Sequence, residues 1–396
     1  MGSTLNGASE TTGGSVLRVG VIGVGNISKQ YFAEFPKLPN LELVVVADLD
    51  LARAAEVAAE QGVRSSSVDE LLADPEVDVV LNLTIPAAHA DVALRALEAG
   101  KHVYGEKPLA LSTAEARPVL ELAAAKGLRF GSAPDTVLGS GVQTALAVLD
   151  SGAIGRPIAA AVAWSAPGHE LWHPAPAFYY QPGGGPLLDM GPYYLTSLVS
   201  FFGPVVRVSG AVARSDRERS VATGALAGTP IPVHEEVDTH VTAILEHANG
   251  VVSTVTVSFE VWASRVPLFE VYGTGGTVAV PDPNRFSDPV EIATADDRTW
   301  RAVPDSAGFV DAGRGVGLSD LAEAIEQNRP HRASGDLAFH VLEIMEAIIV
   351  AGREHRVVEL TSTVDRPAPV ARELSLRHSS SRSDQRRVTV RGQGEG

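Results

Sequence analysis

The feature that most constrains this chain is a regular alternation of short apolar runs with amphipathic stretches between Leu17 and Gly131. An apolar run of roughly four to eight residues bounded by turn residues is typical of a buried strand. Alternating strands and helices predict a parallel sheet with crossover helices on its faces. The predicted strands are Leu17–Ile22, Leu41–Ala47, Val77–Leu83, His102–Gly105 and Leu128–Gly131.

Residues that start and stop helices support this alternation. A helix is predicted over Leu51–Gln61, ended by Gly62, and another over Ala87–Ala99, ended by Gly100, because glycine is common just past a helix end. A Ser followed three residues later by Glu is the capping-box spacing. The two predicted boxes are Ser67 with Glu70 and Ser112 with Glu115, the second opening a helix that Gly127 ends.

After about Ala133 the rhythm changes to consecutive strand-like runs without helices between them, which favours a mostly antiparallel sheet. A chain of 396 residues suggests two domains. The predicted class is therefore α/β, with an N-terminal Rossmann domain and a C-terminal α+β domain that has a large, open, mostly antiparallel sheet. The predicted divisions are a disordered segment 1–15, domains 16–133 and 134–362, and a polar, disordered tail 363–396. The predicted later elements are strands Pro157–Trp164, Val205–Ala213, Asp238–Glu246, Val251–Phe259, Leu268–Tyr272 and Thr277–Val280, and helices Gly141–Leu149, Pro192–Phe202, Leu318–Gln327 and Leu337–Arg353.

Composition excludes several classes of function. The formal net charge of −16 disfavours nucleic acid and anionic membranes as partners. The chain has no cysteine, which excludes disulfides, thiolate zinc sites and a cysteine nucleophile. No run is long enough to span a bilayer, and residues 1–15 lack the apolar centre of a signal peptide. We therefore expect a cytoplasmic protein.

A glycine-rich loop follows the first predicted strand. Gly23-x-Gly25-x-x-Ser28 lies between a strand and a helix, which is the context of a dinucleotide-binding loop. Gly23 allows the tight turn and Gly25 lets the backbone approach a pyrophosphate, while Ser28 occupies the position of the usual third glycine.

Asp48 ends the second predicted strand, at the distance expected for the acidic residue that binds the adenosine ribose. Its carboxylate can accept hydrogen bonds from both ribose hydroxyls and would repel a 2′-phosphate. Leu49 follows where a phosphate site would favour arginine. These residues favour NAD over NADP as the cofactor.

Lys107 lies just after a predicted strand, at the sheet edge where ligands of parallel sheets bind. Only five of the 32 basic residues of the chain are lysines, so a lysine rather than an arginine at this position suggests a chemical role. Lysine offers a compact charge whose pKa can fall when it is desolvated. A surface lysine is the alternative interpretation.

Asp189 and Tyr193 are four residues apart, so a helical turn places them on one side. Together with an ammonium from the first domain they would form a proton-transfer site, because a nearby cation favours an ionised phenol and burial opposes it. A helix cap and a packed tyrosine are the alternative.

The chain resembles the Gfo/Idh/MocA family of oxidoreductases, from residue 17 to about residue 360. The resemblance rests on the glycine loop Gly23-Val24-Gly25-Asn26-Ile27-Ser28, on Asp78-Val79-Val80-Leu81-Asn82-Leu83-Thr84-Ile85-Pro86 with His89, on Ala99-Gly100-Lys101-His102-Val103-Tyr104-Gly105-Glu106-Lys107-Pro108, and on Gly184-Gly185-Pro186-Leu187-Leu188-Asp189-Met190-Gly191.

The resemblance implies hydride transfer between a nicotinamide and a carbon of a sugar, glycoside or cyclitol. It implies that Lys107 contacts the substrate and the nicotinamide ribose, and that Asp189 and Tyr193 handle the proton; Tyr193 stands where many members carry histidine, which leaves either residue as the general base. Asp135 is expected to contact the substrate; it stands where a basic residue is more usual, so substrate recognition is expected to differ from that of the inositol dehydrogenases. The implied cofactor-binding residues are Gly23, Gly25, Asn26, Ile27, Asp48, Thr84, Pro86, His89, Glu106 and Lys107.

The segment His169-Glu170-Leu171-Trp172-His173 matches a zinc-protease pattern by letter. That chemistry needs both histidines on one stable helix. Pro167, Gly168 and Pro174 flank the segment, so we expect a loop near the substrate instead, with no metal. We expect Trp172, His173 and Tyr179 to contact the substrate, with simple loop packing as the alternative.

Two further expectations concern partners and activity. The partners expected are a small polyhydroxylated substrate and further copies of this chain, in a homodimer or homotetramer formed through the antiparallel sheet. A non-catalytic, dinucleotide-binding regulatory protein on the same scaffold is the alternative function, because fold alone does not establish activity.

Overall fold

The structure is a computed structural model of the chain, and it describes residues 16–371. The predicted N-terminal segment 1–15 and residues 372–396 of the predicted tail lie outside the described residues. Among the described residues, no helix is long and apolar enough to cross a membrane.

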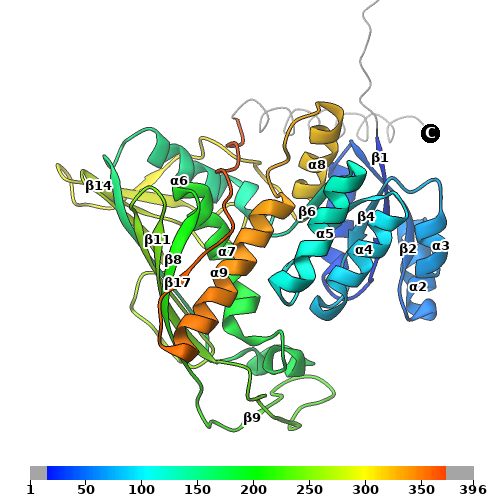
Figure 1. Ribbon diagram of the computed structural model, residues 1–396, viewed down its shortest axis with the longest axis horizontal. Coiled ribbons are helices and arrows are strands. Elements are labelled where there is room, and N and C mark those ends of the chain that lie inside the picture. Colours follow the sequence, from blue (N-terminus) through cyan, green and yellow to red (C-terminus); the bar gives the residue numbers. More distant parts are fainter. Residues whose placement is uncertain (1–15, 372–396) are drawn as a thin grey trace, which may run out of the picture.

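Six strands form a wholly parallel sheet at the N-terminal end of the chain (Figure 1). Five of them overlap the predicted strands, and the short strand Arg64–Ser66 was not predicted. The strand order is β3-β2-β1-β4-β5-β6, so the chain reverses direction across the sheet beside β1. In an open sheet of this kind, ligands bind at the carboxyl ends of the strands near this reversal. Its elements are β1 (Leu17–Ile22), α1 (Ser28–Glu34), β2 (Leu41–Ala47), α2 (Leu51–Gln61), β3 (Arg64–Ser66), α3 (Val68–Ala73), β4 (Val79–Asn82), α4 (His89–Glu98), β5 (His102–Gly105), α5 (Thr113–Lys126) and β6 (Phe130–Ser132).

Helices cover both faces of this sheet, because its strands are apolar on both sides. Val80 and Val103 belong to the same core as Ala96 of α4, whereas Val79 packs on the opposite face in a core with Tyr31 of α1. Helix α8 (Val316–Glu326), which comes far later in the chain, adds Leu318, Leu321 and Ala322 to this second core. Helix α8 belongs by sequence to the predicted second domain, 134–362, but it packs with the first domain.

The second half of the chain forms a nine-stranded sheet, in which the β7–β12 pair is parallel and the other strand pairs of the described residues are antiparallel. The predicted class, a Rossmann domain followed by an α+β domain with a mostly antiparallel sheet, is confirmed. The elements are α6 (Ser140–Asp150), β7 (Pro157–Ser165), α7 (Gly185–Phe202), β8 (Val205–Ala213), β11 (His240–His247), β12 (Val252–Ser258), β13 (Phe269–Gly273), β14 (Gly276–Ala279), β15 (Val290–Thr294), β16 (Arg301–Val303), α9 (Gly335–Glu354) and β17 (Val358–Glu359), with a small separate hairpin β9 (Arg219–Ser220) and β10 (Pro230–Ile231).

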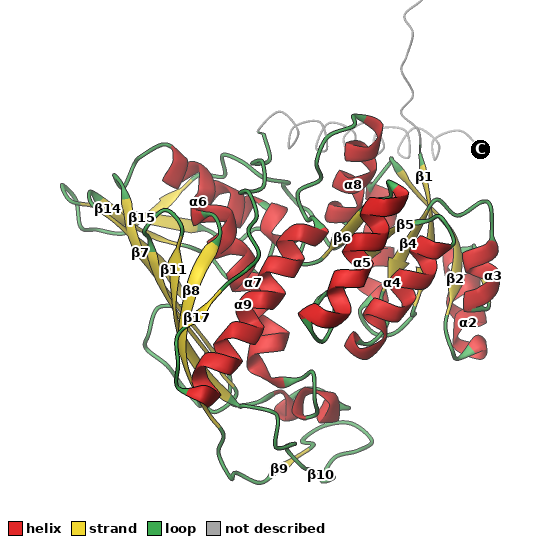
Figure 2. Cartoon of the chain, in the orientation of Figure 1, coloured by secondary structure: helices red, strands yellow, loops and turns green. Residues whose placement is uncertain are grey.

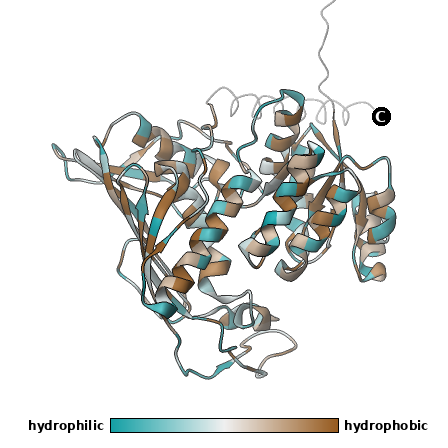
Figure 3. Cartoon of the chain, viewed as in Figure 1, coloured by the Kyte–Doolittle hydropathy of each residue, from teal (hydrophilic) through white to brown (hydrophobic). Residues whose placement is uncertain are grey.

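Helices α6, α7 and α9 pack on one face of the nine-stranded sheet (Figure 2). Their apolar residues join the core on the side of α4 and α5, so one continuous core runs from the first domain into the second. Hydrophilic and hydrophobic stretches alternate along α4, α5 and α9, as expected of helices that bury one side (Figure 3). Among the described residues, no helix covers the other face of this sheet (Figure 2).

Helix α7 differs from its prediction in a way that matters for the site. The sequence places proline at the start of a helix at Pro192, but the helix begins at Gly185 and Pro192 lies inside it. Pro186 occupies the first turn, the position proline tolerates best. An interior proline has no N–H, so Pro192 gives no helical hydrogen bond to the Leu188 carbonyl in the turn that carries Asp189.

The second predicted capping box is only half formed. The hydroxyl of Ser112 accepts a hydrogen bond from the Glu115 N–H, but Glu115 Oε2 accepts from the backbone of Leu111 instead of Ser112. The first box, Ser67 with Glu70, is complete and confirms the prediction.

The prediction of a disordered tail from residue 363 is wrong for its first nine residues, 363–371, which the structure describes. This segment is extended and tied to the core. Arg366 Nε donates to the Ser200 carbonyl (2.8 Å), and Val370 is 1% exposed with its N–H bonded to Gln143 Oε1 (2.8 Å). The polar composition of this segment does not reveal these contacts, because they join it to residues far away in the sequence.

Candidate active site

The glycine loop has the geometry that a dinucleotide needs. Gly23 has φ = +95°, and a Cβ at this position would lie 2.7 Å from the Leu83 carbonyl oxygen, so glycine is required. A Cβ at Gly25 would meet no atom within 4 Å, so the space above it is open to a ligand. Asn26 and Ile27 continue the loop, and the buried Ser28 hydroxyl donates to the Gly25 carbonyl (2.8 Å).

Asp48 holds the glycine loop in place. Its Oδ2 accepts a hydrogen bond from the Val24 N–H and its Oδ1 from the Asp50 N–H, each at 2.9 Å. A carboxylate can accept about four hydrogen bonds, so Asp48 retains capacity for ribose hydroxyls. Leu49 beside it is 95% exposed and offers no cation to a 2′-phosphate.

Thr84 and Pro86 follow β4, and His89 begins α4. Thr84 Oγ1 donates to Asn82 Oδ1 (2.6 Å), and Pro86 opens a short 3₁₀ turn. His89 is 3% exposed, with Nδ1 2.6 Å from the Pro108 carbonyl oxygen and Nε2 3.0 Å from that of Thr84. Burial lowers the pKa of His89. This ring therefore links the loops after β4 and β5, and both of its nitrogens face protein.

Glu106 follows β5 and is buried. Its Oε1 accepts from the Tyr31 hydroxyl (2.8 Å) and its Oε2 from the Lys107 N–H (3.1 Å). These bonds tie the end of β5 to α1, the helix that follows the glycine loop. Glu106 thus fixes the backbone from which Lys107 projects.

Lys107 crosses from the first domain to helix α7. Its Nζ donates to the Asp189 carbonyl oxygen (2.6 Å) and to Asp189 Oδ1 (2.9 Å). The side chains of Lys107 and Asp189 are 14% and 15% exposed. Because an ammonium has three N–H donors, one remains for another acceptor.

The second oxygen of Asp189 contacts His169. Asp189 Oδ2 lies 2.8 Å from His169 Nε2, and the Trp172 Nε1–H donates to His169 Nδ1 (3.0 Å). An indole can only donate, so Nδ1 is the acceptor and Nε2 carries the hydrogen that Asp189 accepts. The sequence predicts Lys107 and Asp189 here, but not His169.

Burial and charge compete at this pair. Burial by itself would raise the pKa of Asp189, but the Lys107 ammonium and the His169 hydrogen bond outweigh it and lower the pKa of Asp189 to about 2. Burial would likewise lower the pKa of Lys107, yet the Asp189 carboxylate raises it above its usual value. Desolvation therefore does not depress the pKa of this lysine, and both groups are charged at neutral pH.

Tyr193 lies one turn after Asp189 and is 3% exposed. Lys107 Nζ lies 5.1 Å from the centre of its ring, over the face rather than at the hydroxyl. The hydroxyl instead accepts a hydrogen bond from Arg314 Nη2 (3.1 Å). The structure therefore brings Lys107, Asp189 and Tyr193 together, but a different cation contacts the phenol oxygen.

Aromatic side chains surround His169 on the solvent side. Tyr179 has its ring centre 4.5 Å from that of His169, and Trp172, at 5.1 Å, is 57% exposed. His173 packs edge-on against Trp172 and Tyr179. Burial, with a contribution from Asp189, raises the pKa of Tyr179. The three predicted substrate residues Trp172, His173 and Tyr179 thus form one wall beside Asp189.

The zinc-protease pattern does not form a zinc helix. Residues His169–Leu171 make a single 3₁₀ turn, and His169 is bonded to Asp189. Glu170 is 3% exposed, accepts a hydrogen bond from the Tyr180 hydroxyl and pairs with Arg219 Nη1 (2.8 Å). Arg219 also pairs with Glu260 at 2.6 Å, so a buried ion cluster holds the turn that carries His169.

Asp135 is buried against the start of α8. It is 0% exposed, and its Oδ2 accepts from the N–H groups of Gly315 (2.7 Å) and Gly317 (3.1 Å) at the start of α8. Burial raises its pKa. Asp135 therefore anchors α8 and, being enclosed, offers no surface to a substrate, contrary to the expectation.

The sequence did not predict three residues of the site: His169, Glu170 and Arg314. His169 and Glu170 lie in a segment predicted as a loop, and Arg314 lies in the triplet Gly313-Arg314-Gly315. That triplet is a usable signal, because a Cβ at Gly313 would lie 2.3 Å from atoms of Glu34 and Gly315 has φ = +109°. Such close packing shows that the chain is pressed against the first domain at Arg314.

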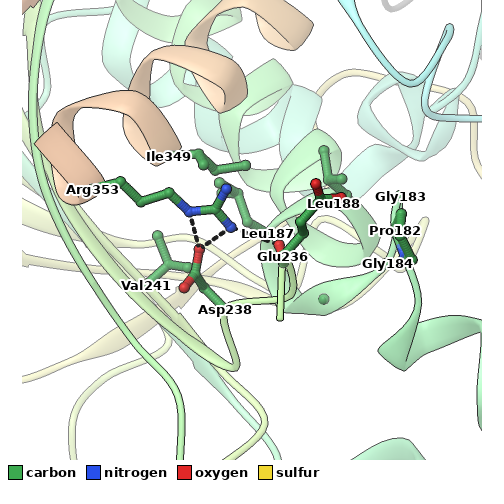
Figure 4. Close-up of a pocket in the computed structure, with 11 residues that line it drawn as sticks. Pro182, Gly183, Gly184, Leu187, Leu188, Glu236, Asp238, Val241, Ile349 and Arg353 are labelled. Carbon is green, nitrogen blue, oxygen red and sulfur yellow. Dashed lines mark hydrogen bonds and ion pairs between the residues drawn. The ribbon is translucent and has the colours of Figure 1, made fainter. Parts of the chain in front are cut away.

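A separate hollow of about 310 Å³ lies behind the start of α7 (Figure 4). Arg353 of α9 spans it and pairs with Asp238 at 2.8 Å, so both charges are satisfied. The hollow contains none of the predicted site residues. Its lining residues are Pro182, Gly183, Gly184, Gly185, Leu187, Leu188, Glu236, Asp238, Val241, Ile349 and Arg353.

Comparisons with known proteins agree with this arrangement. Residues 17–133 match the model of the Gfo/Idh/MocA oxidoreductase family, NAD-binding Rossmann fold, and residues 142–279 match the Gfo/Idh/MocA C-terminal domain. The chain is 30% identical to a trans-1,2-dihydrobenzene-1,2-diol dehydrogenase of Bos taurus, over 78% of this chain and 88% of that protein. It is also 30% identical to a dTDP-3,4-didehydro-2,6-dideoxy-alpha-D-glucose 3-reductase of Streptomyces antibioticus, over 85% and 97%.

Among solved structures, a levoglucosan dehydrogenase in complex with NADH and levoglucosan shares the fold, with a TM-score of 0.75 and 24% identity. The match covers 88% of this chain and all of that one. The family models together span more than half of the chain, in the order of its two domains. The protein is therefore a member of the Gfo/Idh/MocA family of NAD-binding oxidoreductases.

Proposed function

We propose that this protein is an NAD-dependent dehydrogenase or reductase that moves a hydride between the nicotinamide and a hydroxyl-bearing or keto carbon of a sugar, glycoside or cyclitol. The observation that carries the proposal is the Lys107–Asp189–His169 chain of contacts beside the carboxyl ends of β4 and β5. The named relatives are dehydrogenases and reductases of sugars and diols, which supports this class of substrate.

The residues present fit NAD. Gly23, Gly25, Asn26 and Ile27 would receive the pyrophosphate on the open backbone above Gly25. Asp48 would accept the adenosine ribose hydroxyls, and the absence of a cation at Leu49 favours NAD over NADP. When bound, the nicotinamide accepts or supplies the hydride. Thr84, Pro86, Glu106 and Lys107 lie at the strand ends that would face it.

Lys107 would direct its remaining N–H to the reacting oxygen of the substrate. Its charge is fixed, so it stabilises negative charge on that oxygen as the hydride leaves or arrives. Asp189 keeps Lys107 and His169 in place, and with a pKa of about 2 it is a poor proton acceptor near neutrality. Tyr193 is therefore the favoured residue to exchange the hydroxyl proton.

The aromatic wall would hold the rest of the substrate. Trp172, 57% exposed, would offer its ring to a stacked sugar. Tyr179 packs against Phe178 and His169, and His173 contacts both Trp172 and Tyr179, so these residues would support that ring. The Trp172 indole also bonds His169, so a ring stacked on Trp172 would lie within two side chains of Asp189.

The uncovered face of the nine-stranded sheet would join copies of this chain in a homodimer or homotetramer. Uncharged side chains pair across its strands, with Thr254 beside Ala161 and Ile244, and Thr242 beside Thr256. Ile244 is 48% exposed there. Light scattering after size exclusion would test this, and a monomer at micromolar concentration would refute it. The cytoplasmic location stays a prediction.

A panel of sugars, glycosides and cyclitols, assayed with NAD and NADP by the absorbance of reduced nicotinamide, tests the function. We expect turnover with at least one polyol, and faster with NAD. Tight NAD binding without turnover on any member would favour the regulatory alternative instead.

A further inference from the structure

Arg314 is a buried cation that the function above does not use. It lies between β16 and α8, is 9% exposed, and reaches across the boundary between the domains. Its Nε donates to Gln30 Oε1 (2.9 Å) on α1, and its Nη2 donates to Asn284 Oδ1 (3.2 Å) and to the Tyr193 hydroxyl (3.1 Å). One guanidinium thus touches the helix after the glycine loop and the phenol of α7.

The remaining nitrogen of Arg314 makes a long ion pair. Nη1 is buried without a hydrogen bond and lies 3.9 Å from Glu106 Oε1. Lys107, by contrast, is bonded directly to Asp189. The positive charge at the Tyr193 oxygen therefore comes from Arg314.

Guanidinium groups donate hydrogen bonds and do not accept them. The Tyr193 oxygen must be the acceptor from Arg314, so the phenol hydrogen is free to point elsewhere. A cation in direct contact with that oxygen also stabilises the phenolate that forms when the proton leaves.

We propose that Arg314 is a positioning residue for Tyr193: it orients the phenol oxygen, favours its ionised form, and couples it through Gln30 to the helix that follows the glycine loop. This proposal rests on the proposed function, in which Tyr193 exchanges the proton. The groups that face Tyr193 are Lys107, Tyr179, Tyr194 and Arg314, with Asp189 one turn earlier, and those that face Arg314 are Tyr31, Glu106 and Asp135.

The first test needs no substrate. Ultraviolet difference absorbance against Tyr193→Phe isolates the ionisation of this phenol from that of the other tyrosines. The same difference is then measured between Arg314→Gln and the Arg314→Gln/Tyr193→Phe double variant. Without the arginine, the ionisation of Tyr193 should occur at a pH higher by at least about one unit than in the wild type. Arg329→Gln, at an ion-paired arginine after α8, is the matched control and should leave the curve in place.

Arg314→Lys keeps the charge but has a shorter side chain that cannot reach both partners, so it should give a smaller shift in the same direction. Circular dichroism identifies the variants that fold. If a folded variant, Arg314→Gln or Arg314→Lys, shows the same Tyr193 ionisation curve as the wild type, the proposal is overturned.

A kinetic cycle separates this role from a purely structural one. With a substrate from the panel, Arg314→Gln should lower kcat/KM by at least about tenfold in the wild-type background but less than about twofold in Tyr193→Phe, because the arginine acts through the phenol. Equal losses in both backgrounds contradict the proposal. If no polyol turns over, the proposed function fails, while the absorbance titration still decides the role of Arg314.

Discussion

The Lys107 ammonium and the Asp189 carboxylate meet at 2.9 Å across the boundary between the two domains. Lys107 comes from the loop after a parallel strand and Asp189 from a helix 82 positions later. Each charge holds the other ionised against the cost of burial, so the pair is both an element of the site and a link between the domains.

Lys107→Ala should lower kcat by about a hundred- to a thousandfold, because it removes the cation that faces the reacting oxygen. NAD affinity, measured by protein fluorescence, should change by less than about threefold, since the glycine loop is untouched. Lys126→Ala, at an exposed lysine bonded to the Glu98 carbonyl, is the control. Retained turnover in Lys107→Ala would remove this residue from the mechanism.

The pH dependence of stability should carry the signature of Asp189. Its pKa is lower in the folded chain than its usual value of 3.8, so its contribution is present at neutral pH and is lost as the pH falls from about 4 towards 2. The contribution is on the order of 2 kcal/mol.

Urea unfolding of the wild type and of Asp189→Asn measures this. The difference in unfolding free energy between them should shrink as the pH falls through that window. A difference that stays constant between pH 7 and about pH 3 would show that Asp189 titrates normally in the folded protein.

Two substitutions at Trp172 should separate its hydrogen bond from its ring. Trp172→Phe keeps an aromatic face but loses the donor to His169, and should lower kcat about fivefold with little change in KM. Trp172→Ala also removes the stacking face and should raise KM about tenfold. Steady-state kinetics of both variants test this, and identical effects would argue against a stacking role.

Glu170→Gln should destabilise the fold by about 3 kcal/mol, because it removes one of the two carboxylates that pair with the buried Arg219 and leaves Glu260. The exposed pair Arg207–Glu246 gives the control: Glu246→Gln should cost less than about 1 kcal/mol. Denaturant unfolding compares the two, and equal losses would mean that the cluster does not hold the His169 turn.

Local sequence signals predicted the first domain well. The strands Leu17–Ile22 and Leu41–Ala47 and the helix Leu51–Gln61 have the predicted bounds, because apolar runs and glycine stops act within a few residues. The start of α7 was wrong because two prolines compete for the first turn, and the structure uses Pro186.

The site was only partly predictable, since some of its contacts depend on folding at long range. Lys107 and Asp189 stand out in the sequence, and the structure places them in contact. His169 reaches Asp189 only because buried ion pairs fold its loop inward, and Arg314 reaches Tyr193 only because α8 packs on the first domain. No local pattern contains either relationship. The prediction that Asp135 contacts the substrate was wrong for the same kind of reason, because the sequence does not show that α8 encloses this residue.

The most direct test of the central claim follows the hydride itself. The enzyme is incubated with NAD and polyols deuterated at carbon, and the reduced nicotinamide is examined by mass spectrometry. We predict that one deuterium is transferred from substrate carbon to the nicotinamide by the wild type, and that the transfer is reduced at least about a hundredfold in Lys107→Ala. Reduced nicotinamide that carries no deuterium, or equal transfer by both proteins, would contradict hydride transfer at this site.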